Sequence, residues 1–335
     1  MKQEMILTVD SGTTNTRVLL WRGECVIAAA QRNVGVRDTA RDGNNARLRA
    51  GVKQAIEEAL AAAGASIDQV AALFASGMIT SNVGLYELPH LIAPASQADF
   101  VAGVREVLLE DVCSRPICFI PGLKNRASVT LDTLEEMDII RGEEVETLAL
   151  LGRLPAGRPY LFVLPGSHMK FISVSADRRI QGILTSIAGE LLSVLSEHTI
   201  LADSVQRGYL RIENYRRELL FRGYRTAKAT SFSRAAFSTR ILSQFISRDP
   251  ADAQSFLLGA VLQNDVQAIR SSAALTVNPE TEVIVSGKEP FSTALIDLLT
   301  EERYFADVRG FACPEGLSLS GLGALAIAKD YLAAR

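Results

Sequence analysis

The most constraining feature of this chain is a pair of apolar runs joined by a polar turn near its start. Ile6, Leu7 and Val9 form the first run and residues 18–21 form the second, with Gly12 between them. Two β-type runs joined by a glycine-containing turn predict a hairpin. Nearly every side chain of the turn can form hydrogen bonds, and its glycine allows close approach of the backbone to a ligand. The pattern favours a hairpin that binds an anion such as phosphate, with a plain hairpin bearing a polar tip as the alternative.

The turn contains candidate ligands for both a phosphate and a metal ion. Backbone N–H groups and hydroxyls can surround a phosphate. Asp10 ends the first run and is a hard oxygen ligand suited to Mg²⁺, directly or through water. A carboxylate that caps the turn is the alternative for Asp10. The candidate phosphate contacts are Ser11, Gly12, Thr13, Thr14 and Asn15.

A second stretch, residues 160–174, has the same design. Aligning Gly166 with Gly12 places Ser167 on Thr13, and it also places Ile172 on Val18 and Val174 on Leu20. A repeat at this distance predicts duplicated domains with one hairpin in each. Because hairpins are common, coincidence is the alternative.

The rest of the chain alternates strand and helix patterns, which predicts α/β layers with a ligand cleft between the two halves. Gly142 is followed by Glu143, Glu144 and Glu146, and acids in the first turns of a helix suit the positive end of its dipole. Gly152 and Pro155 end that segment and mark the first candidate domain boundary. Helices are expected at 46–63, 96–109, 182–205, 251–269, 291–300 and 316–335, and strands at 70–76, 116–120 and 281–285.

Composition excludes several classes of protein. A net charge of −3 and 6% aromatic residues argue against a nucleic-acid partner. No stretch reaches 18 uninterrupted apolar residues, so no membrane span is expected, and Asp10 interrupts the first apolar run before any signal-peptide cleavage site. The four cysteines form no Cys-x-x-Cys pair and there are three histidines, which disfavours a zinc site and favours reduced thiols in a cytoplasmic protein.

The order of these pieces resembles the sugar-kinase/Hsp70/actin superfamily. DSGTTNTR and LPGSHMK resemble its two phosphate hairpins, VIVSGK its adenosine turn, and SLSGLGALAIA its second connecting helix. Within the superfamily the chain is similar to the 2-dehydro-3-deoxygalactonokinase family. The similar blocks are GMITSNVGLYELPHLIAPA, IPGL, DIIRGEEVETLALLG, LPGSHMKFI and FSTR (77–95, 120–123, 138–152, 164–172 and 237–240).

The chain also departs from that family's pattern. The family more often carries an arginine near Asn82, which weakens the transfer of substrate contacts to that position. It more often has Thr-Gln where this chain has Val145-Glu146, and PGTHSKW in the second phosphate turn.

The resemblance implies a fold of two actin-like (ribonuclease H-like) α/β domains with a central cleft. It divides the chain into an N-terminal domain (1–155), a C-terminal domain (156–317) and a connecting helix (318–335) that packs back towards the N-terminal domain. The implied reaction transfers the γ-phosphoryl group of ATP, with Mg²⁺, to the C6 hydroxyl of 2-dehydro-3-deoxy-D-galactonate, a keto sugar acid. A kinase of another small sugar or sugar acid and an actin/Hsp70-type ATPase switch are the alternatives, and a homodimer is left open.

The resemblance also assigns roles to residues. Gly166, Ser167, His168 and Lys170 would contact the phosphates from the second domain, although Lys170 could equally be a solvated hairpin lysine. A carboxylate must accept the proton of the attacking hydroxyl, and we expect Glu143, followed by Asp138 and Glu144, in that role. Helix capping by surface acids is the alternative. Gly287 and Lys288 would lie near the adenosine. The substrate carboxylate suits a bidentate arginine, and the candidate substrate contacts are Arg17, Met78, Asn82, Arg141 and Arg240.

Overall fold

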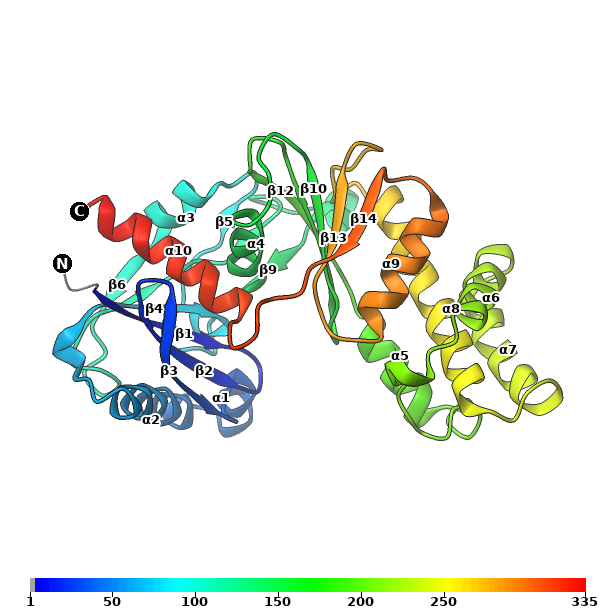
Figure 1. Ribbon diagram of the computed structural model, residues 1–335, viewed down its shortest axis with the longest axis horizontal. Coiled ribbons are helices and arrows are strands. Elements are labelled where there is room, and N and C mark those ends of the chain that lie inside the picture. The colour runs from blue at the N-terminus through cyan, green and yellow to red at the C-terminus, as the bar shows by residue number, and fades with distance from the viewer. Residues whose placement is uncertain (1–3) are drawn as a thin grey trace.

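The computed structural model describes residues 4–335 and contains two large sheets (Figure 1). The first sheet has the strand order β3-β2-β1-β4-β7-β6, in which β1, β2 and β3 are antiparallel and β4 and β7 continue parallel to β1. Its strands are β1 (Met5–Ser11), β2 (Thr16–Arg22), β3 (Cys25–Arg32), β4 (Val70–Gly77), β6 (Arg105–Val107) and β7 (Ile117–Phe119).

The second sheet repeats this arrangement in the order β12-β11-β10-β13-β14. Its first three strands are again antiparallel neighbours, and the last two run parallel to β10. The predicted second hairpin is therefore real and holds the same place in its sheet as the first. The strands are β10 (Tyr160–Leu164), β11 (Met169–Val174), β12 (Ile180–Ser186), β13 (Glu282–Val285) and β14 (Asp307–Gly310).

The register of the second hairpin corrects the predicted alignment by one residue. Asp10 pairs with Arg17 in the first hairpin, whereas Leu164, which aligns with Asp10, pairs with Lys170. The second turn is therefore one residue shorter, and Lys170 rather than Phe171 is the counterpart of Arg17. The repeat also replaces the carboxylate of Asp10 by an apolar side chain.

Two helices, α4 (Glu143–Leu151) and α10 (Leu319–Ala333), lie between the sheets and share one apolar core with both of them. This core contains Trp21 of the first sheet, Phe162 of the second, and Val145 and Leu325 of the two helices. The small residues of α10 allow the close packing predicted for them, because a Cβ atom at Gly323 would lie 1.9 Å from the carbonyl oxygen of Val145.

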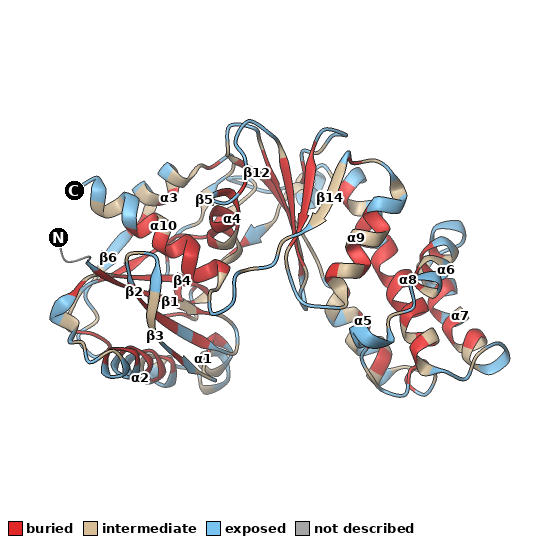
Figure 2. Cartoon of the chain, in the orientation of Figure 1, coloured by how far each residue is buried: buried red, intermediate tan, exposed pale blue. Residues whose placement is uncertain are grey.

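The outer faces of the sheets carry their own helices. Successive strand residues point to opposite faces, so Ile6 joins the central core while Leu7 packs under α2 (Ala46–Ala62). Nearby helices of this lobe are α1 (Val36–Asp42) and α3 (Gln97–Gly103). The outer face of the second sheet packs on α8 (Pro250–Ser271), which is buried along most of its length (Figure 2). The remaining helices of the second lobe are α5 (Ala188–His198), α6 (Arg217–Ala229), α7 (Phe232–Phe245) and α9 (Phe291–Glu302).

Two helix predictions were wrong in part. Helix 96–109 ends at Gly103, because residues 105–107 form β6 and pair with β7. The predicted helix 182–205 begins as strand β12, whose backbone pairs with β11, and becomes helical only at Ala188. In both cases the backbone hydrogen bonds are made with a distant strand, which a local apolar pattern does not reveal.

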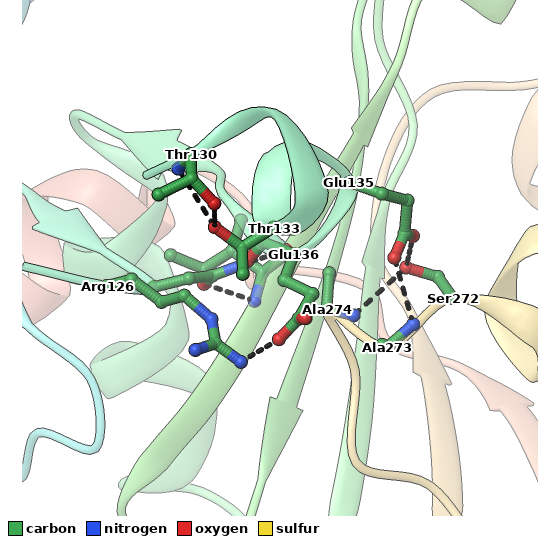
Figure 3. A network of polar contacts seen from close by, with 10 residues as sticks. Arg126, Thr130, Thr133, Glu135, Glu136, Ser272, Ala273 and Ala274 are labelled. Atoms are coloured by element: carbon green, nitrogen blue, oxygen red, sulfur yellow. Dashed lines mark hydrogen bonds and ion pairs between the residues drawn. The ribbon is translucent and has the colours of Figure 1, made fainter. Parts of the chain in front are cut away.

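A segment of short elements joins the two lobes. It includes the sheet β5-β8-β9 (Leu91–Ile92, Leu123–Lys124 and Ile139–Ile140) and the 3₁₀ helix η3 (Leu131–Glu136). Figure 3 shows Glu135 of η3 accepting hydrogen bonds from Ser272 and from the backbone of Ala273, which follow α8 in the second lobe. Other 3₁₀ helices are η1 (Ile67–Gln69), η2 (Met78–Thr80) and η4 (Ile212–Asn214).

Within residues 4–335, no helix is long and apolar enough to cross a membrane. The proposed boundary at 155/156 lies between α4 and β10, and the boundary at 317/318 lies just before α10. This division stays a prediction.

Candidate functional site

Two adjoining hollows lie where the hairpin turns of the two sheets face each other. The Gly287 hollow has a volume of about 650 Å³, and the Asn82 hollow about 490 Å³. Lining the Gly287 hollow are Asp10, Glu146, the turn Leu164–Ser167, Ser286–Lys288 and Leu319. Lining the Asn82 hollow are Gly12, Thr13, Met78, Ser81, Asn82, Glu87, His90, Ile139 and Ile140.

Four side chains form the wall that both hollows share. They are Arg141, Glu143, His168 and Lys170, which come from both lobes. Of the two alternatives for Lys170, the structure shows the cleft-facing one, because its side chain is only 14% exposed. The Lys170 ammonium lies 3.8 Å from Oε1 of Glu143 and donates to Oγ1 of Thr185 at 3.0 Å.

Glu143 is the first residue of α4 and faces both hollows. Burial raises the pKa of its carboxyl above the usual range, and the negative charge of Asp10 adds to that rise, while Lys170 opposes it. A carboxylate with a raised pKa is a stronger proton acceptor than an exposed one. Glu143 therefore presents to both hollows a carboxyl group whose pKa is raised.

The other two candidate bases have structural partners. Both carboxylate oxygens of Glu144 accept from the backbone N–H of Gly142, and the side chain is fully buried. Burial raises the pKa of Glu144 to about 8. Asp138 accepts from the backbone N–H and the hydroxyl of Thr185. Neither residue lines a hollow, which is a correction to their place among the predicted catalytic groups, because their oxygens are engaged within the fold.

Only part of the first hairpin turn lines the cleft. Gly12 and Thr13 line the Asn82 hollow, and a Cβ atom at Gly12 would meet only the carbonyl oxygen of Asn15 within 4 Å, at 3.9 Å. The predicted phosphate contact of the Ser11 hydroxyl needs correction, since it is buried and hydrogen-bonded to Thr16 at 2.9 Å. Thr14 accepts from the Asn15 amide, and neither of these two side chains lines a hollow.

Asp10 faces the Gly287 hollow from the end of β1. Burial raises the pKa of its carboxyl, while the Ser320 hydroxyl and Arg17 oppose the rise. Two glycines with positive φ lie on this side of the hollow: Gly77 (+87°), where a Cβ atom would lie 3.1 Å from the Asp10 carboxylate, and Gly142 (+115°), where a Cβ atom would lie 3.4 Å from Gly77 Cα. Both positions favour glycine, because other residues adopt these backbone angles at a cost.

The side chains around Asp10 fit a Mg²⁺ ion that takes most of its ligands from phosphates and water. Within residues 4–335, no three His, Cys, Asp or Glu side chains converge closely enough to hold a metal ion by themselves. Mg²⁺ in phosphoryl-transfer sites commonly uses one or two carboxylates, with phosphates and water completing its shell. Asp10, with Glu146 on the same wall, meets that requirement.

The second turn packs tightly against the start of α5. A Cβ atom at Gly189 would lie 2.2 Å from the carbonyl oxygen of Gly166, and Glu190 N–H donates to the carbonyl of Ser167 at 2.9 Å. His168 pairs with Glu190 at 3.1 Å, and both side chains are largely exposed. Gly166, Ser167 and His168 therefore line the Gly287 hollow from a turn that packs against the start of α5.

Gly287 and Lys288 are exposed and line the same hollow. A Cβ atom at Gly287 would lie 2.7 Å from the Pro165 ring. The glycine is therefore required for packing of the two turns, a reason that the sequence did not suggest.

The structure separates the three candidate arginines. Arg141 lines both hollows and donates to Thr80 Oγ1 at 2.7 Å and to the carbonyl of Leu88 at 2.6 Å. Arg17 is exposed on β2 and lines a separate hollow beside Gln31. The predicted substrate contact of Arg240 is not supported by the fold, because α7 packs on α6 and α8 and the residue lines neither cleft hollow.

Several lining residues were missed, among them Glu146 and His90. Glu146 lies one turn after Glu143 on α4, and burial together with Asp10 and Glu143 raises its pKa to about 8. Its helical spacing from Glu143 was the available signal. His90 lies beside Arg141, and burial together with the positive charge of Arg141 lowers its pKa to about 4. A histidine in a proline-rich loop offered no comparable signal.

Comparison with known proteins yields one family. The family model described as 2-keto-3-deoxy-galactonokinase matches residues 10–309. The chain is 29% identical over 197 residues to a protein of Rhizobium meliloti (strain 1021) described as a probable 2-dehydro-3-deoxygalactonokinase. It is 26% identical over 196 residues to the 2-dehydro-3-deoxygalactonokinase of Escherichia coli (strain K12). These alignments cover 59% and 58% of this chain and 58% of each relative, so the chain spans under two thirds of the relatives it matches.

Solved structures agree on the fold. A Sinorhizobium meliloti structure assigned as a 2-dehydro-3-deoxygalactonokinase has a TM-score of 0.74 at 23% identity, covering 97% of this chain and 96% of that one. Component A of (R)-2-hydroxyglutaryl-CoA dehydratase from Acidaminococcus fermentans has a TM-score of 0.51 at 14% identity, covering 98% and 99%. The predicted α/β class with two actin-like units facing a cleft is confirmed.

Proposed function

This chain belongs to the 2-keto-3-deoxy-galactonokinase family, and we propose that it transfers the γ-phosphoryl group of ATP to the C6 hydroxyl of 2-dehydro-3-deoxy-D-galactonate. The observation that carries the proposal is the wall shared by the two hollows, with Glu143 and Lys170 on it. ATP in the Gly287 hollow and the sugar acid in the Asn82 hollow would meet at that wall. Phosphoryl transfer needs such a meeting point, with attacking and leaving oxygens roughly in line.

In this proposal the Gly287 hollow binds ATP. Gly287 and Lys288 lie near the adenosine, while Gly166, Ser167 and His168 contact the phosphates. Gly12 and Thr13 reach the γ-phosphate from the Asn82 side. Asp10 would hold Mg²⁺, which when bound neutralises charge on the phosphates.

Glu143 accepts the proton of the C6 hydroxyl as that oxygen attacks the γ-phosphorus. Its position at the shared wall and its raised pKa support this assignment. Lys170 keeps the carboxylate ionised and adds positive charge where the transferring group carries negative charge.

Arg141 is our candidate for the substrate carboxylate, since of Arg17, Arg141 and Arg240 it alone lines the Asn82 hollow. Two of its nitrogens are held by Thr80 and Leu88, so the guanidinium is oriented before the substrate arrives, with further N–H groups to donate. Met78 and Asn82 complete the acceptor site. The four cysteines form no disulfide, which supports the proposed cytoplasmic location, and a homodimer stays a prediction.

One coupled assay tests the proposal. ATP consumption is measured with 2-dehydro-3-deoxygalactonate, its gluconate epimer, gluconate and no acceptor. We expect turnover with the galactonate derivative well above the acceptor-free rate. Equal turnover without any acceptor would instead support an ATPase switch, and preference for another acid would support a kinase of different specificity.

A further inference from the structure

A chain of polar contacts leads from the edge of the second sheet into the cleft. Lys170 and Thr185 face each other across the antiparallel β11–β12 pair, and Lys170 Nζ donates to Thr185 Oγ1 at 3.0 Å. The same ammonium lies 3.8 Å from Oε1 of Glu143. Thr185 is therefore the hydrogen-bonding anchor that holds Lys170 beside Glu143.

Asp138 determines which way the Thr185 hydroxyl points. Its Oδ1 accepts from Thr185 Oγ1 at 3.0 Å, and its Oδ2 accepts from the Thr185 backbone N–H. A hydroxyl has one hydrogen, and an ammonium has no lone pair to accept it. Because that hydrogen points to Asp138, the lone pairs of Oγ1 remain for Lys170. Asp138 lies in the first lobe and Thr185 in the second, so the arrangement exists only when the lobes are packed as observed.

Acidic groups surround Glu143, so a cation beside it has a large effect on the pKa of its carboxyl group. The negative charge of Asp10, on β1, acts on Glu143, and Glu144 and Glu146 lie on the same helix as Glu143. Arg141 and His168 share its wall, but Arg141 is engaged with Thr80 and Leu88, and His168 with Glu190. Of the three basic residues on this wall, Lys170 is the one that forms an ion pair with Glu143.

We propose that Thr185 is a positioning residue that holds Lys170 against Glu143, and that Asp138 positions Thr185 from the opposite lobe. This inference rests on the proposed function, in which Glu143 is the base. Loss of the anchor lets Lys170 turn towards solvent, so Glu143 binds its proton more tightly. An opposite charge within this distance lowers a carboxyl pKa by about one unit or more, so its release raises the pKa by a similar amount.

Thr185→Val and Thr185→Ser test the anchor as a matched pair. Valine keeps the shape and removes the hydroxyl, whereas serine keeps the hydroxyl. The pH dependence of kcat/KM is measured for both variants and for the wild type. We expect the acid limb of Thr185→Val to move to higher pH by about one unit, and that of Thr185→Ser to stay with the wild type. Coincident acid limbs for all three proteins would overturn the proposal.

Asp138→Asn provides a second, independent variant. Asparagine puts one carbonyl oxygen and one NH₂ group where aspartate has two oxygens, and the fixed backbone N–H of Thr185 can only donate, so it keeps the oxygen. The Thr185 hydroxyl then faces the NH₂ group and loses the acceptor that orients its hydrogen away from Lys170. The acid limb should therefore move in the same direction. A lower melting temperature with an unmoved acid limb would mean that Asp138 is purely structural and would contradict the inference. Glu143→Gln separates this failure from failure of the proposed function: wild-type turnover in Glu143→Gln would remove the base assignment itself.

Discussion

Two adjacent glutamates at the start of α4 lie in different surroundings. Glu143 and Glu144 begin the same helix, yet Glu143 faces the cleft and Glu144 turns back to the N–H of Gly142. Side chains one position apart on a helix point about 100° apart, so only one of the pair can face a given hollow. Gly142, with a positive φ of +115°, precedes the pair as the N-cap of α4.

Glu143→Gln should reduce kcat by about two orders of magnitude or more, since glutamine cannot accept the proton of the attacking hydroxyl. ATP affinity should change little, because the amide keeps the shape of the wall. Steady-state kinetics and nucleotide titration measure the two effects. Glu57→Gln, on the exposed side of α2, is the control and should keep wild-type rates. A Glu143→Gln enzyme with nearly normal kcat would exclude this residue as the base.

Glu144 should make stability depend on pH. Its pKa in the folded protein is about 8, above the ordinary value of 4.5, so folding favours the protonated form. The stability that it contributes is fully present below about pH 4.5 and is lost as the pH rises through about 8. Relative to Glu144→Gln, the wild type should therefore lose melting temperature as the pH rises from about 4.5 to about 8. A constant difference between the two proteins across that range would contradict the raised pKa.

At the scale of elements, the site depends on a helix pair that both sheets share. Helix α4 presents Glu143 and Glu146, and α10 presses against it closely enough that only glycine fits at position 323. The same pair fills the core between the sheets. The contact between α4 and α10 therefore fills the core and also sets the position of the two cleft-facing carboxylates.

Gly323→Ala should destabilise the protein by about 1–3 kcal/mol, because a methyl group there collides with the Val145 backbone and forces the helices apart. Urea unfolding measures the loss, and kcat should fall as α4 shifts. Gly152→Ala is the matched control at the end of α4, where φ is −60° and the nearest atoms are 3.6 Å away. Equal stability of the two variants would show that the α10–α4 contact is not tight in solution.

For the whole molecule, the β12 edge of the second sheet is one of the places where the two lobes contact each other. Strand β12 is an edge strand, and its backbone is paired by Asn125 at Ile183, by Asp138 at Thr185 and by Ala95 at Ile180. The first lobe thus supplies the hydrogen bonds that a neighbouring strand would make, which also protects the edge from other chains.

Asn125→Ala should weaken that junction. The side-chain amide accepts from Ile183 N–H at 2.9 Å and donates to its carbonyl at 2.8 Å, so its removal leaves both groups unpaired at a cost of about 1–3 kcal/mol. Hydrogen exchange at Ile183 should accelerate while exchange in α8 stays slow. Thr133→Ala, whose side-chain hydroxyl bonds within the first lobe, should leave Ile183 unchanged. Slow exchange at Ile183 in Asn125→Ala would show that the junction is held elsewhere.

The sequence alone predicted the two hairpins, their duplication, the α/β layers and the family. The hairpins and the layers follow from local patterns such as an apolar run or a turn with glycine, whereas the family was indicated by the resemblance of longer sequence blocks. The sequence also placed Asp10, Glu143 and the second turn among the candidate site residues, because residue type and neighbouring sequence were enough to suggest their chemistry.

The tertiary structure decided which candidates meet. It brought Arg141 to the cleft and left Arg240 on an outer helix, turned the Ser11 hydroxyl into the hairpin, and added Glu146 to the wall. It also gave Asp138 a partner 47 residues away in the other lobe. The physical reason is that a side chain's direction and its partners depend on contacts between distant strands and helices, whereas a sequence pattern reports only the backbone's local preference.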